Sequence, residues 1–341
     1  MMTNRIKFGV IGVGLMGSLF AEIVNDLPEC ELIAVADLDE AKVDSIMKRH
    51  KVVGYTDYQE LLARNDINSV IIAVPEKYHL KPAIDSLNAG KHVFIEKPLA
   101  YNVSDAAQIV ECSQKHTNSV LMVAHVLRFD PRYIHAHNIV SSGKIGKISH
   151  LYGRRNISTV NAVTVGKRSS PIFYTGIHDI DIFHWITGQR IISVWAQGTR
   201  RILTEFGVSV DDVVLANFKL ESGAIGILEV SFVMPTVQGC KKTPCLEIVG
   251  DQGMLFVDTY EQGITVLGPD IAKYPENFYC FEPLMHGRFS GVYHDELRHF
   301  VDCIKMGTKP IVGANDGYNA VAVAEALETS LRSGREEKVA Y

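Results

Sequence analysis

The segment that decides the fold runs from Phe8 to Gly17 and reads Phe-Gly-Val-Ile-Gly-Val-Gly-Leu-Met-Gly. It begins inside the short apolar run Ile6–Ile11, which predicts a strand, and helical spacing of apolar residues follows at Leu19–Leu27. A Gly-x-Gly-x-x-Gly pattern is weak by itself, but here it joins a predicted strand to a predicted helix. That position predicts the first turn of a βαβ unit that binds a dinucleotide.

Each glycine of the pattern has its own physical purpose. Gly12 permits a tight turn, Gly14 lets the backbone approach a pyrophosphate, and Gly17 lets the helix pack closely on the strand. The first turn of the helix then offers its free N–H groups to the phosphates. We therefore expect the cofactor to contact these three glycines together with Leu15 and Met16. The alternative is a glycine turn that binds no ligand.

Apolar strand-like runs alternate with helical stretches throughout residues 1–125. Such alternation is typical of βαβ units with right-handed crossovers and a parallel sheet. We therefore expect residues 1–125 to form a doubly wound α/β domain of the Rossmann type. The predicted strands are Ile6–Ile11, Glu31–Ala36, Ser69–Val74, His92–Ile95 and Val120–Ala124, and the predicted helices are Leu19–Leu27, Glu40–His50, Tyr58–Arg64 and Leu80–Ala89.

The pattern changes after this first domain. Two pairs of strands with alternating polar and apolar residues are joined by short turns, as in antiparallel hairpins. We therefore expect residues 126–341 to form a substrate-binding and oligomerisation domain of the α+β class, with a largely antiparallel open sheet. Helices should cover one face of the sheet and leave the other for a partner subunit. The hairpins are Val214–Leu220 with Ala224–Phe232 and Leu246–Val249 with Met254–Asp258, after a helix at Arg132–Ser141.

Two amphipathic helices are predicted near the end of the chain, at Asp295–Ile304 and Gly317–Arg332. We expect this C-terminal part to pack back on the first domain. The stretch Gly268–Gly287 shows the least pattern, and we interpret it as a lid or as an arm that contacts another subunit.

The composition of the 341 residues argues against several classes of protein. Lys and Arg number 34 and Asp and Glu number 39, so the net charge of −5 disfavours a chain that coats nucleic acid or an anionic membrane. No apolar run approaches the roughly 18 residues of a transmembrane helix, and the polar start Met1–Lys7 does not resemble a signal peptide. Six scattered cysteines predict free thiols, without a disulfide framework or a metal site. We therefore expect a cytoplasmic protein.

Asp37 ends the second predicted strand, twenty residues after Gly17. An acidic side chain at this distance accepts hydrogen bonds from the ribose hydroxyls of the cofactor. Because a 2′-phosphate would face a carboxylate there and no arginine follows immediately, NAD is favoured over NADP. Asp37 can alternatively cap the helix that begins near Glu40, although Asp39 fits that role better.

Glu96-Lys97-Pro98 directly follows the fourth predicted strand. A lysine at the carboxyl edge of a parallel sheet points into the crevice where ligands bind, and its ammonium can donate a hydrogen bond to a substrate hydroxyl. Pro98 should stiffen the turn and is a candidate for a cis peptide bond. Taken alone, Lys97 beside Glu96 is more often a solvated surface pair.

Together, these motifs resemble the Gfo/Idh/MocA oxidoreductases, a family that includes glucose–fructose oxidoreductase and inositol 2-dehydrogenase. The resemblance extends over nearly the whole chain. Its most specific part is the combination of Glu96-Lys97-Pro98 with the segment Gly176-Ile177-His178-Asp179-Ile180-Asp181. The other matching segments are Gly12–Gly17, Val74-Pro75 with His79, Arg128–Pro131, Gly143–Gly146, and the stretch from Glu296 and Phe300 through Asp316-Gly317 to the final helix.

The resemblance implies roles for individual residues. Lys97 resembles the lysine that contacts both the nicotinamide and the substrate hydroxyl. His178 resembles the histidine that acts as general base, a role that suits an imidazole because its pKa is near the working pH. His178 can alternatively be a histidine of the core. Further cofactor contacts are implied at Val74, Pro75, His79 and Glu96.

The neighbours of His178 leave alternatives open. Asp181 lies three residues later, so it can share a helix face with His178 and orient the imidazole, or it can interact with the helix dipole. Many family members carry an aspartate four residues before the histidine, where this chain has Tyr174. A phenol there can take part in catalysis as a proton donor or acceptor, or it can fill the pocket wall. This departure puts the carry-over of inositol as substrate in doubt.

Further polar residues are candidates for the substrate pocket, although each type is more often structural. His125 and Arg128 follow the fifth predicted strand, and Arg128 can alternatively pair with Asp130 or brace the domain junction. Arg154 is expected just after the first strand of the second domain. The pairs Arg154-Arg155 and Lys167-Arg168 would suit an anionic substrate group, but a charge cluster is usually a solvated face. Asp181 and His294 complete the candidates.

We therefore expect an NAD-dependent enzyme that transfers hydride between nicotinamide and a secondary alcohol of a sugar, sugar derivative or cyclitol. His178 would remove the hydroxyl proton while Lys97 polarises the oxygen. One alternative is an oxidoreductase with tightly bound, recycled NAD that acts on glycosides or nucleotide sugars. Another is a non-catalytic NAD-binding sensor or regulator. The expected partners are a small polyol or sugar and further copies in a homodimer or homotetramer through the C-terminal sheet, but neither nucleic acid nor a membrane.

Overall fold

The computed structural model describes residues 5–235, 243–258, 264–268, 271–276 and 284–341. The chain divides into two compact units, which are described one at a time. The first unit comprises Met1–Val126 and Glu282–Tyr318, and the second comprises Leu127–Phe281 and Asn319–Tyr341. The segment Glu282–Tyr318, which we had assigned to the second domain, thus groups with the first unit.

The first unit contains a six-stranded sheet in the order β3-β2-β1-β4-β5-β6, and every neighbouring pair is parallel. This order reverses direction at β1 and β4, as in doubly wound nucleotide-binding folds. All five predicted strands are confirmed, whereas β3 is a short strand that the apolar pattern did not indicate. The strands are β1 Ile6–Ile11, β2 Cys30–Ala36, β3 Val53–Tyr55, β4 Ser69–Ile72, β5 His92–Glu96 and β6 Leu121–Ala124.

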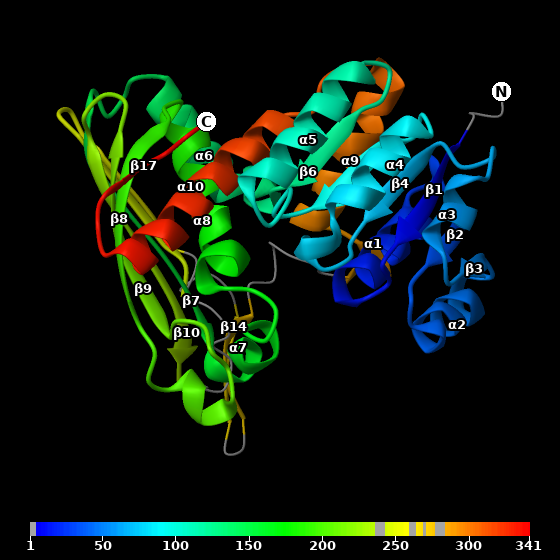
Figure 1. Ribbon diagram of the computed structural model, residues 1–341, viewed down its shortest axis with the longest axis horizontal. Coiled ribbons are helices and arrows are strands. Elements are labelled where there is room, and N and C mark those ends of the chain that lie inside the picture. Colours follow the sequence, from blue (N-terminus) through cyan, green and yellow to red (C-terminus); the bar gives the residue numbers. More distant parts are fainter. Residues whose placement is uncertain (1–4, 236–242, 259–263, 269–270, 277–283) are drawn as a thin grey trace. The chain divides into compact units, whose positions relative to one another are not determined.

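Helices lie on both faces of this sheet (Figure 1). A cluster of aromatic rings forms part of the core: the ring centroids of Phe20 and Phe94 are 5.0 Å apart, and those of Phe94 and Phe300 are 5.6 Å apart. Phe300 belongs to α9, so this late helix packs within the first unit. The helices are α1 Leu15–Asp26, α2 Glu40–His50, α3 Tyr58–Leu62, α4 Leu80–Asn88, α5 Val103–Lys115 and α9 Val292–Met306, with a 3₁₀ turn at Glu76–Tyr78.

The second unit contains a seven-stranded sheet in the order β12-β11-β7-β10-β9-β8-β17. Only β7 and β10 pair in parallel, and the other neighbours are antiparallel, so the expected open, largely antiparallel sheet is confirmed. Both predicted hairpins are present, as β9 with β10 and as β11 with β12. The strands are β7 Ile148–Ser158, β8 Ile191–Thr199, β9 Val213–Leu220, β10 Ile225–Met234, β11 Cys245–Gly250, β12 Met254–Asp258 and β17 Glu337–Lys338.

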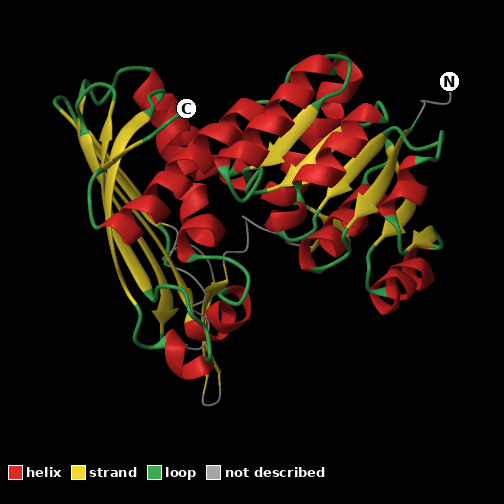
Figure 2. Ribbon diagram, in the orientation of Figure 1, coloured by secondary structure: helices red, strands yellow, loops and turns green. Residues whose placement is uncertain are grey.

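Helices cover one face of this second sheet (Figure 2). On β9, Val214, Ala216 and Phe218 are buried on that face, while the alternate residues Leu215 and Lys219 are exposed on the other. The helices are α6 Pro131–Ser141, α7 Thr159–Val165, α8 Ile177–Thr187 and the later part of α10 Ala314–Ser333, with short helical turns at Val126–Phe129, Ile172–Gly176 and Leu203–Phe206.

The remaining strands pair two by two, as β13 Ile264–Gly268 with β14 Ile271–Glu276 and β15 Leu284–Met285 with β16 Arg288–Phe289. Much of the proposed lid or arm at Gly268–Gly287 lies outside the described residues. Of the six cysteines, Cys240 and Cys280 also lie outside them, and the four that are described are buried free thiols. In the described part of the chain, no helix is both long and apolar enough to cross a membrane.

Candidate active site

The glycine-rich turn between β1 and α1 is shaped by close backbone contacts. Gly12 has a φ of +87°, a conformation that suits glycine, and its N–H donates to the carbonyl of Ala36 at 2.7 Å. A Cβ atom at Gly12 would lie 2.8 Å from the carbonyl carbon and oxygen of Ala73. At Gly17 a Cβ atom would lie 1.8 Å from the carbonyl oxygen of Gly12. Both positions therefore require glycine for reasons internal to the fold.

Gly14 differs from the other two glycines because no atom of the described structure would meet its Cβ within 4 Å. Gly14 is the N-cap residue of α1, so no side chain occupies the N-terminal N–H groups of this helix as a cap. Leu15 is 88% exposed beside it, and Met16 is half-buried. Open space beside the first N–H groups of a helix suits a phosphate group, so this turn fits the pyrophosphate of a dinucleotide.

Asp37 lies at the end of β2 and binds the glycine-rich turn directly. Its Oδ2 accepts from the N–H of Val13 at 2.8 Å and its Oδ1 accepts from the N–H of Asp39 at 3.0 Å. The helix-capping role belongs to Asp39, which accepts from the N–H of Ala41 at 3.1 Å. Asp37 is only half-buried, so its carboxylate lies at the surface beside the turn, as a ligand for ribose hydroxyls must.

His79 joins the loop after β4 to the turn after β5. Its Nε2 is 2.9 Å from the carbonyl oxygen of Val74, and its Nδ1 is 2.8 Å from that of Pro98. Burial lowers the pKa of His79, whereas the two carbonyl contacts and Glu76 act in the opposite direction. The residue is 1% exposed, and its contact with the cofactor stays a prediction. Its contact with Val74 helps to hold the loop that carries the half-buried Val74 and the exposed Pro75.

Lys97 follows β5 in the turn that contains the Lys97–Pro98 peptide, which is cis. Its own N–H donates to Oε2 of Glu96 at 3.1 Å. Glu96 is buried while Lys97 is half-buried, so the two are not the solvated surface pair considered as an alternative. His125 follows β6 at the same edge of the sheet, but its ring is buried at 1% exposure.

Two buried ion pairs hold the first turns of α8 in the second unit. Nε and Nη2 of Arg155 lie 2.7 and 2.9 Å from the carboxylate oxygens of Asp179, and Nη2 also lies 3.3 Å from the hydroxyl of Tyr133. Nε and Nη2 of Arg128 lie 2.9 and 2.5 Å from the carboxylate oxygens of Asp181. The predicted substrate contacts Arg128 and Asp181 thus bind each other.

The neighbouring charged residues are also paired. Nη2 of Arg132 lies 2.6 Å from Oδ2 of Asp130, so these two residues form an ion pair. Burial raises the pKa of Asp179, and the guanidinium of Arg155 opposes that rise. Arg155 therefore binds a buried carboxylate, and its role toward an anionic substrate stays a prediction. The sequence analysis missed the Arg155–Asp179 pair, since its two residues are 24 positions apart.

His178 is the second residue of α8, and Tyr174 lies one turn earlier in the π-helical segment Ile172–Gly176. Both side chains are half-buried, and Nδ1 of His178 is buried. Residues four positions apart lie on nearly the same side of such a helix, and π turns occur often at functional sites. The ring of Tyr174 packs edge-on against Phe232 with centroids 6.2 Å apart, and Cζ of Arg168 lies 5.5 Å from the centre of the same ring.

The structure corrects the expectation for Arg154, which lies inside β7 and not after it. Its neighbours Gly153 and Arg155 face α8, since a Cβ atom at Gly153 would meet Phe183 and Arg155 binds Asp179. Successive side chains of a strand point to opposite faces, so Arg154 lies on the face away from α8. Its Nε donates to the carbonyl of Thr243 at 3.2 Å.

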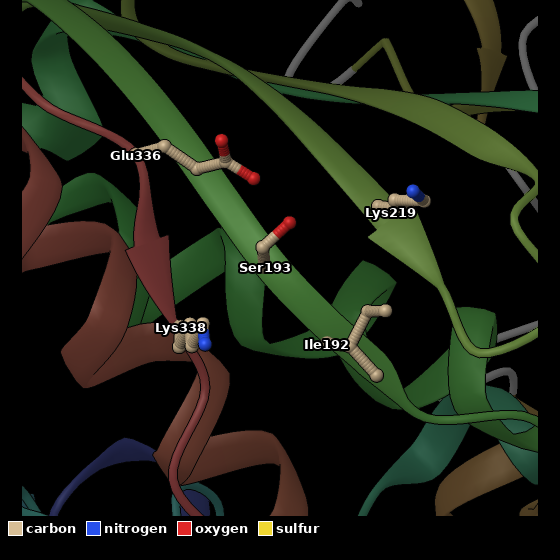
Figure 3. A pocket seen from close by; sticks show the side chains of 5 residues that line it. All are labelled: Ile192, Ser193, Lys219, Glu336 and Lys338. Atoms are coloured by element: carbon tan, nitrogen blue, oxygen red, sulfur yellow. The ribbon is translucent and has the colours of Figure 1, made fainter.

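A cavity of about 380 Å³ lies elsewhere in the second unit, where β17 pairs with β8 (Figure 3). Its lining includes none of the predicted site residues. The residues that line it are Ile192, Ser193, Lys219, Glu336 and Lys338. His294, a further candidate from the sequence, belongs to α9 of the first unit, and its Nδ1 lies 3.3 Å from Oδ1 of Asp295.

Comparison with known proteins identifies relatives over the whole chain. Residues 6–125 match the model of the oxidoreductase family with an NAD-binding Rossmann fold (GFO_IDH_MocA), and residues 133–256 match the GFO/IDH/MocA C-terminal domain. Inositol 2-dehydrogenase of Salmonella typhimurium is 28% identical over 342 residues, which cover 98% of this chain and 96% of that protein. The scyllo-inositol 2-dehydrogenase (NAD(+)) of Bacillus subtilis is 29% identical over 340 residues, which cover 98% and 96%.

A solved structure is also similar to this chain over nearly its whole length. The crystal structure of scyllo-inositol dehydrogenase from Lactobacillus casei with bound NAD(H) and scyllo-inositol is 27% identical, with a TM-score of 0.86. The similarity covers 99% of this chain and 100% of that chain.

Proposed function

This chain belongs to the Gfo/Idh/MocA oxidoreductase family, and on that premise we propose that it is an NAD-dependent dehydrogenase acting on a secondary alcohol of a cyclitol or sugar. The observation that carries the proposal is the coexistence of a complete dinucleotide turn, with open space at Gly14, and the lysine and histidine that the family uses for proton transfer. A non-catalytic sensor would not need both of those side chains. The inositol dehydrogenases among the relatives indicate the class of substrate.

The cofactor side of the proposal rests on residues of the first unit. Gly12, Gly14 and Gly17 with Leu15 and Met16 would hold the pyrophosphate, Asp37 the ribose, and the loop at Val74 and Pro75 the nicotinamide end. NAD, when bound, supplies the acceptor for the hydride. The carboxylate of Asp37 disfavours a 2′-phosphate, so NADP is the weaker ligand.

The proton chemistry is assigned to Lys97 and His178. The Lys97 ammonium donates a hydrogen bond to the substrate oxygen and stabilises negative charge that develops there. His178 accepts the hydroxyl proton; because its Nδ1 is buried, Nε2 is the nitrogen that exchanges the proton. Arg128 and Arg155 act indirectly, since they hold the carboxylates of α8 and thereby fix the helix turn that carries His178. The side chain of Tyr174 lies on nearly the same side of that helix as His178.

The experiment is to mix the purified protein with NAD and a panel of inositols, hexoses, alkyl glycosides, acidic sugars and UDP-sugars, and to follow nicotinamide absorbance. We expect reduction with one class, lost by at least about a hundredfold in Lys97→Met because general acid–base groups contribute that much. NAD binding measured by calorimetry should persist in this variant. Lys115→Met is the matched control, since Lys115 is an exposed residue of α5 that pairs with Glu111.

Other outcomes would redirect the proposal. If no compound reduces NAD but denatured protein releases NADH, the cofactor is retained and recycled. If NAD binds without any turnover or retained NADH, the protein is a sensor. Equal activity of Lys97→Met and wild type would remove Lys97 from the mechanism.

We further propose that a second copy of this chain covers the exposed face of the second sheet. Several large apolar side chains lie on it: Leu215, Ile225, Ile227 and Phe256 are 52, 61, 44 and 54% exposed. Large exposed apolar patches of this kind mark protein interfaces. Light scattering should give a dimer or tetramer, and Ile225→Glu with Ile227→Glu should shift it toward monomer. The four buried free thiols agree with a reducing compartment, so we place the protein in the cytoplasm.

A further inference from the structure

The cavity at the β17 end of the second sheet is not part of the candidate active site. Its volume of about 380 Å³ lies within the range of small-molecule sites, about 300–1,000 Å³. A register shift in β8, between Ile191 and Ser193, shapes it. Neighbours in a regular strand face opposite sides of the sheet, but here the consecutive residues Ile192 and Ser193 both line the cavity. Such irregularities in strands redirect side chains and often lie next to functional sites.

Three polar side chains of the lining form one row across the sheet. Ser193 of β8 pairs with Lys219 of β9 on one side and with Lys338 of β17 on the other. Residues that pair directly across strands project to the same face, so Ser193 lies between the two lysines (Figure 3). Adjacent strands are about 4.8 Å apart, so the backbones of the two lysines are about 10 Å apart. Both ammonium groups can therefore reach a ligand that lies over Ser193.

Neither of these two lysines is paired with an acidic residue in the described part of the chain. Both are exposed, and neither makes a hydrogen bond or an ion pair with another described residue, although Glu336 lines the same cavity. Other lysines behave differently: Lys81 pairs with Asp85 and Lys115 with Glu111, each at 2.7 Å. The cavity is thus lined by two positive side chains and one negative one, in a chain whose net charge is −5.

Two lysines suit a phosphate group better than a carboxylate. The planar fork of arginine matches the two oxygens of a carboxylate, whereas an ammonium group is a point charge whose rotating donors fit a tetrahedral group. A phosphate monoester carries a charge of about −1.5 to −2 at neutral pH, which two ammonium groups balance. The hydroxyl of Ser193 is a further donor. The cavity also has room for the organic part of such a ligand, to which Ile192 offers an apolar surface.

We propose that this cavity is a binding site for a phosphorylated small molecule of the sugar phosphate class. Lys219 and Lys338 hold the phosphate from two sides, and the hydroxyl of Ser193 donates a hydrogen bond between them. The row continues to Ile225 of β10, which pairs with Lys219 and belongs to the apolar side chains proposed to contact a second copy. The ligand therefore lies at the rim of that face. This inference does not depend on the reaction proposed above.

The experiment measures by calorimetry the binding of glucose 6-phosphate, glucuronate and glucose to the protein saturated with NADH. NADH occupies the glycine-rich turn, which also suits phosphate, and leaves no oxidised cofactor to consume the probes. Glucose 6-phosphate should bind most tightly, glucuronate more weakly and glucose not measurably. Lys219→Gln and Lys338→Gln should each weaken the binding of glucose 6-phosphate by about fivefold or more, because a charge-assisted hydrogen bond is lost at a solvent-exposed position.

Two further comparisons separate a specific site from general charge effects. Lys144→Gln combined with Lys147→Gln removes two exposed lysines of the same unit that do not line the cavity, and it should bind as wild type does. Lys219→Gln combined with Lys338→Gln removes the same total charge and should abolish measurable binding. Glu336→Gln should strengthen binding by about twofold or more, because it removes a repulsive charge. A variant that fails to fold cannot produce such a gain.

The proposal is overturned if glucose 6-phosphate does not bind, if the control pair weakens its binding as much as the cavity pair does, or if glucuronate binds more tightly. If no probe binds and the cavity pair lowers the mass found by light scattering, the cavity receives an acidic side chain of a second copy, which also overturns it. If NADH does not bind, the same comparison on the free protein remains decisive, because none of these residues belongs to the glycine-rich turn. A failure of the proposed dehydrogenase activity leaves these results unchanged.

Discussion

The glycine-rich turn of the first unit and helix α8 of the second unit are both held in position, but by different kinds of contact. In the first, Gly12 and Gly17 position the turn through backbone contacts with residues nearby in the sheet. In the second, buried ion pairs join α8 to residues 24 and 53 positions away. Backbone geometry shapes the glycine-rich turn, with the carboxylate of Asp37 as one further acceptor, whereas helix α8 is oriented by charges that require exact partners. The first region should therefore be sensitive to added volume and the second to a lost partner.

The largest effect is expected when one partner of a buried pair is removed. Arg155→Met leaves the carboxylate of Asp179 buried without its guanidinium, which costs about 3–5 kcal/mol of unfolding free energy. Urea unfolding followed by far-UV circular dichroism measures the loss. Arg200→Met is the control, because Arg200 pairs with Asp211 at the surface and should cost less than about 1 kcal/mol. Equal losses in the two variants would show that the burial of the Arg155–Asp179 pair does not determine its contribution to stability.

Substitutions at Gly17 and Gly14 of the first unit should have different effects. Gly17→Ala places a methyl group against the carbonyl of Gly12 and should cost about 1–3 kcal/mol of stability as well as NAD binding. Gly14→Ala meets no atom of the described residues, so it should leave the melting temperature nearly unchanged and weaken NAD binding alone. Calorimetry for NAD and thermal unfolding distinguish the two effects. If Gly14→Ala binds NAD as wild type does, the pyrophosphate does not approach this position.

Asp37 tests whether a side chain in the first unit has a ligand-binding role besides its structural one. Asp37→Ala removes the acceptor for the N–H groups of Val13 and Asp39 and the expected partner of the ribose. NAD affinity should fall by about tenfold or more, as expected for a hydrogen bond to a charged group, and NADP affinity should fall less. Fluorescence titration with both nucleotides measures the ratio. An equal loss for the two would make Asp37 purely structural.

The smallest expected effect is the change in the pH dependence of stability when His79 is replaced. Burial lowers the pKa of His79 below the ordinary value of about 6.5, so in mildly acidic solution the unfolded chain binds more protons than the folded chain. Stability should therefore fall as the pH is lowered through that ordinary value, by at most about 1.4 kcal/mol per pH unit from this group. His79→Gln should lose less stability than wild type between pH values of about 7 and about 5.

In His79→Gln, the pH dependence of stability should be weaker but should not vanish, because burial also lowers the pKa of His92 and of His299. Urea midpoints at a series of pH values provide the measurement. An identical pH dependence in wild type and His79→Gln would mean that His79 keeps its ordinary pKa. The amide of glutamine can still donate to one of the carbonyls of Val74 and Pro98, which limits the loss at neutral pH.

The sequence by itself determined the class of the first unit, its five longer strands, the two hairpins of the second unit and the family. These features depend on local patterns: apolar periodicity, glycine spacing and short turns act over a few residues. The short strand β3 was missed because three half-buried or exposed residues carry no such pattern. Asp39 was correctly preferred to Asp37 as the cap of α2, again because capping is a local interaction.

Only the tertiary structure decided which charged residues meet. It paired Arg128 with Asp181 and Arg155 with Asp179, directed Arg154 to the opposite face of the sheet, and brought Arg168 to Tyr174. It also made His79 a buried link between two loops. The physical reason is that side-chain pairing across strands and helices depends on register and packing between distant segments, and the residue types in one segment do not encode it.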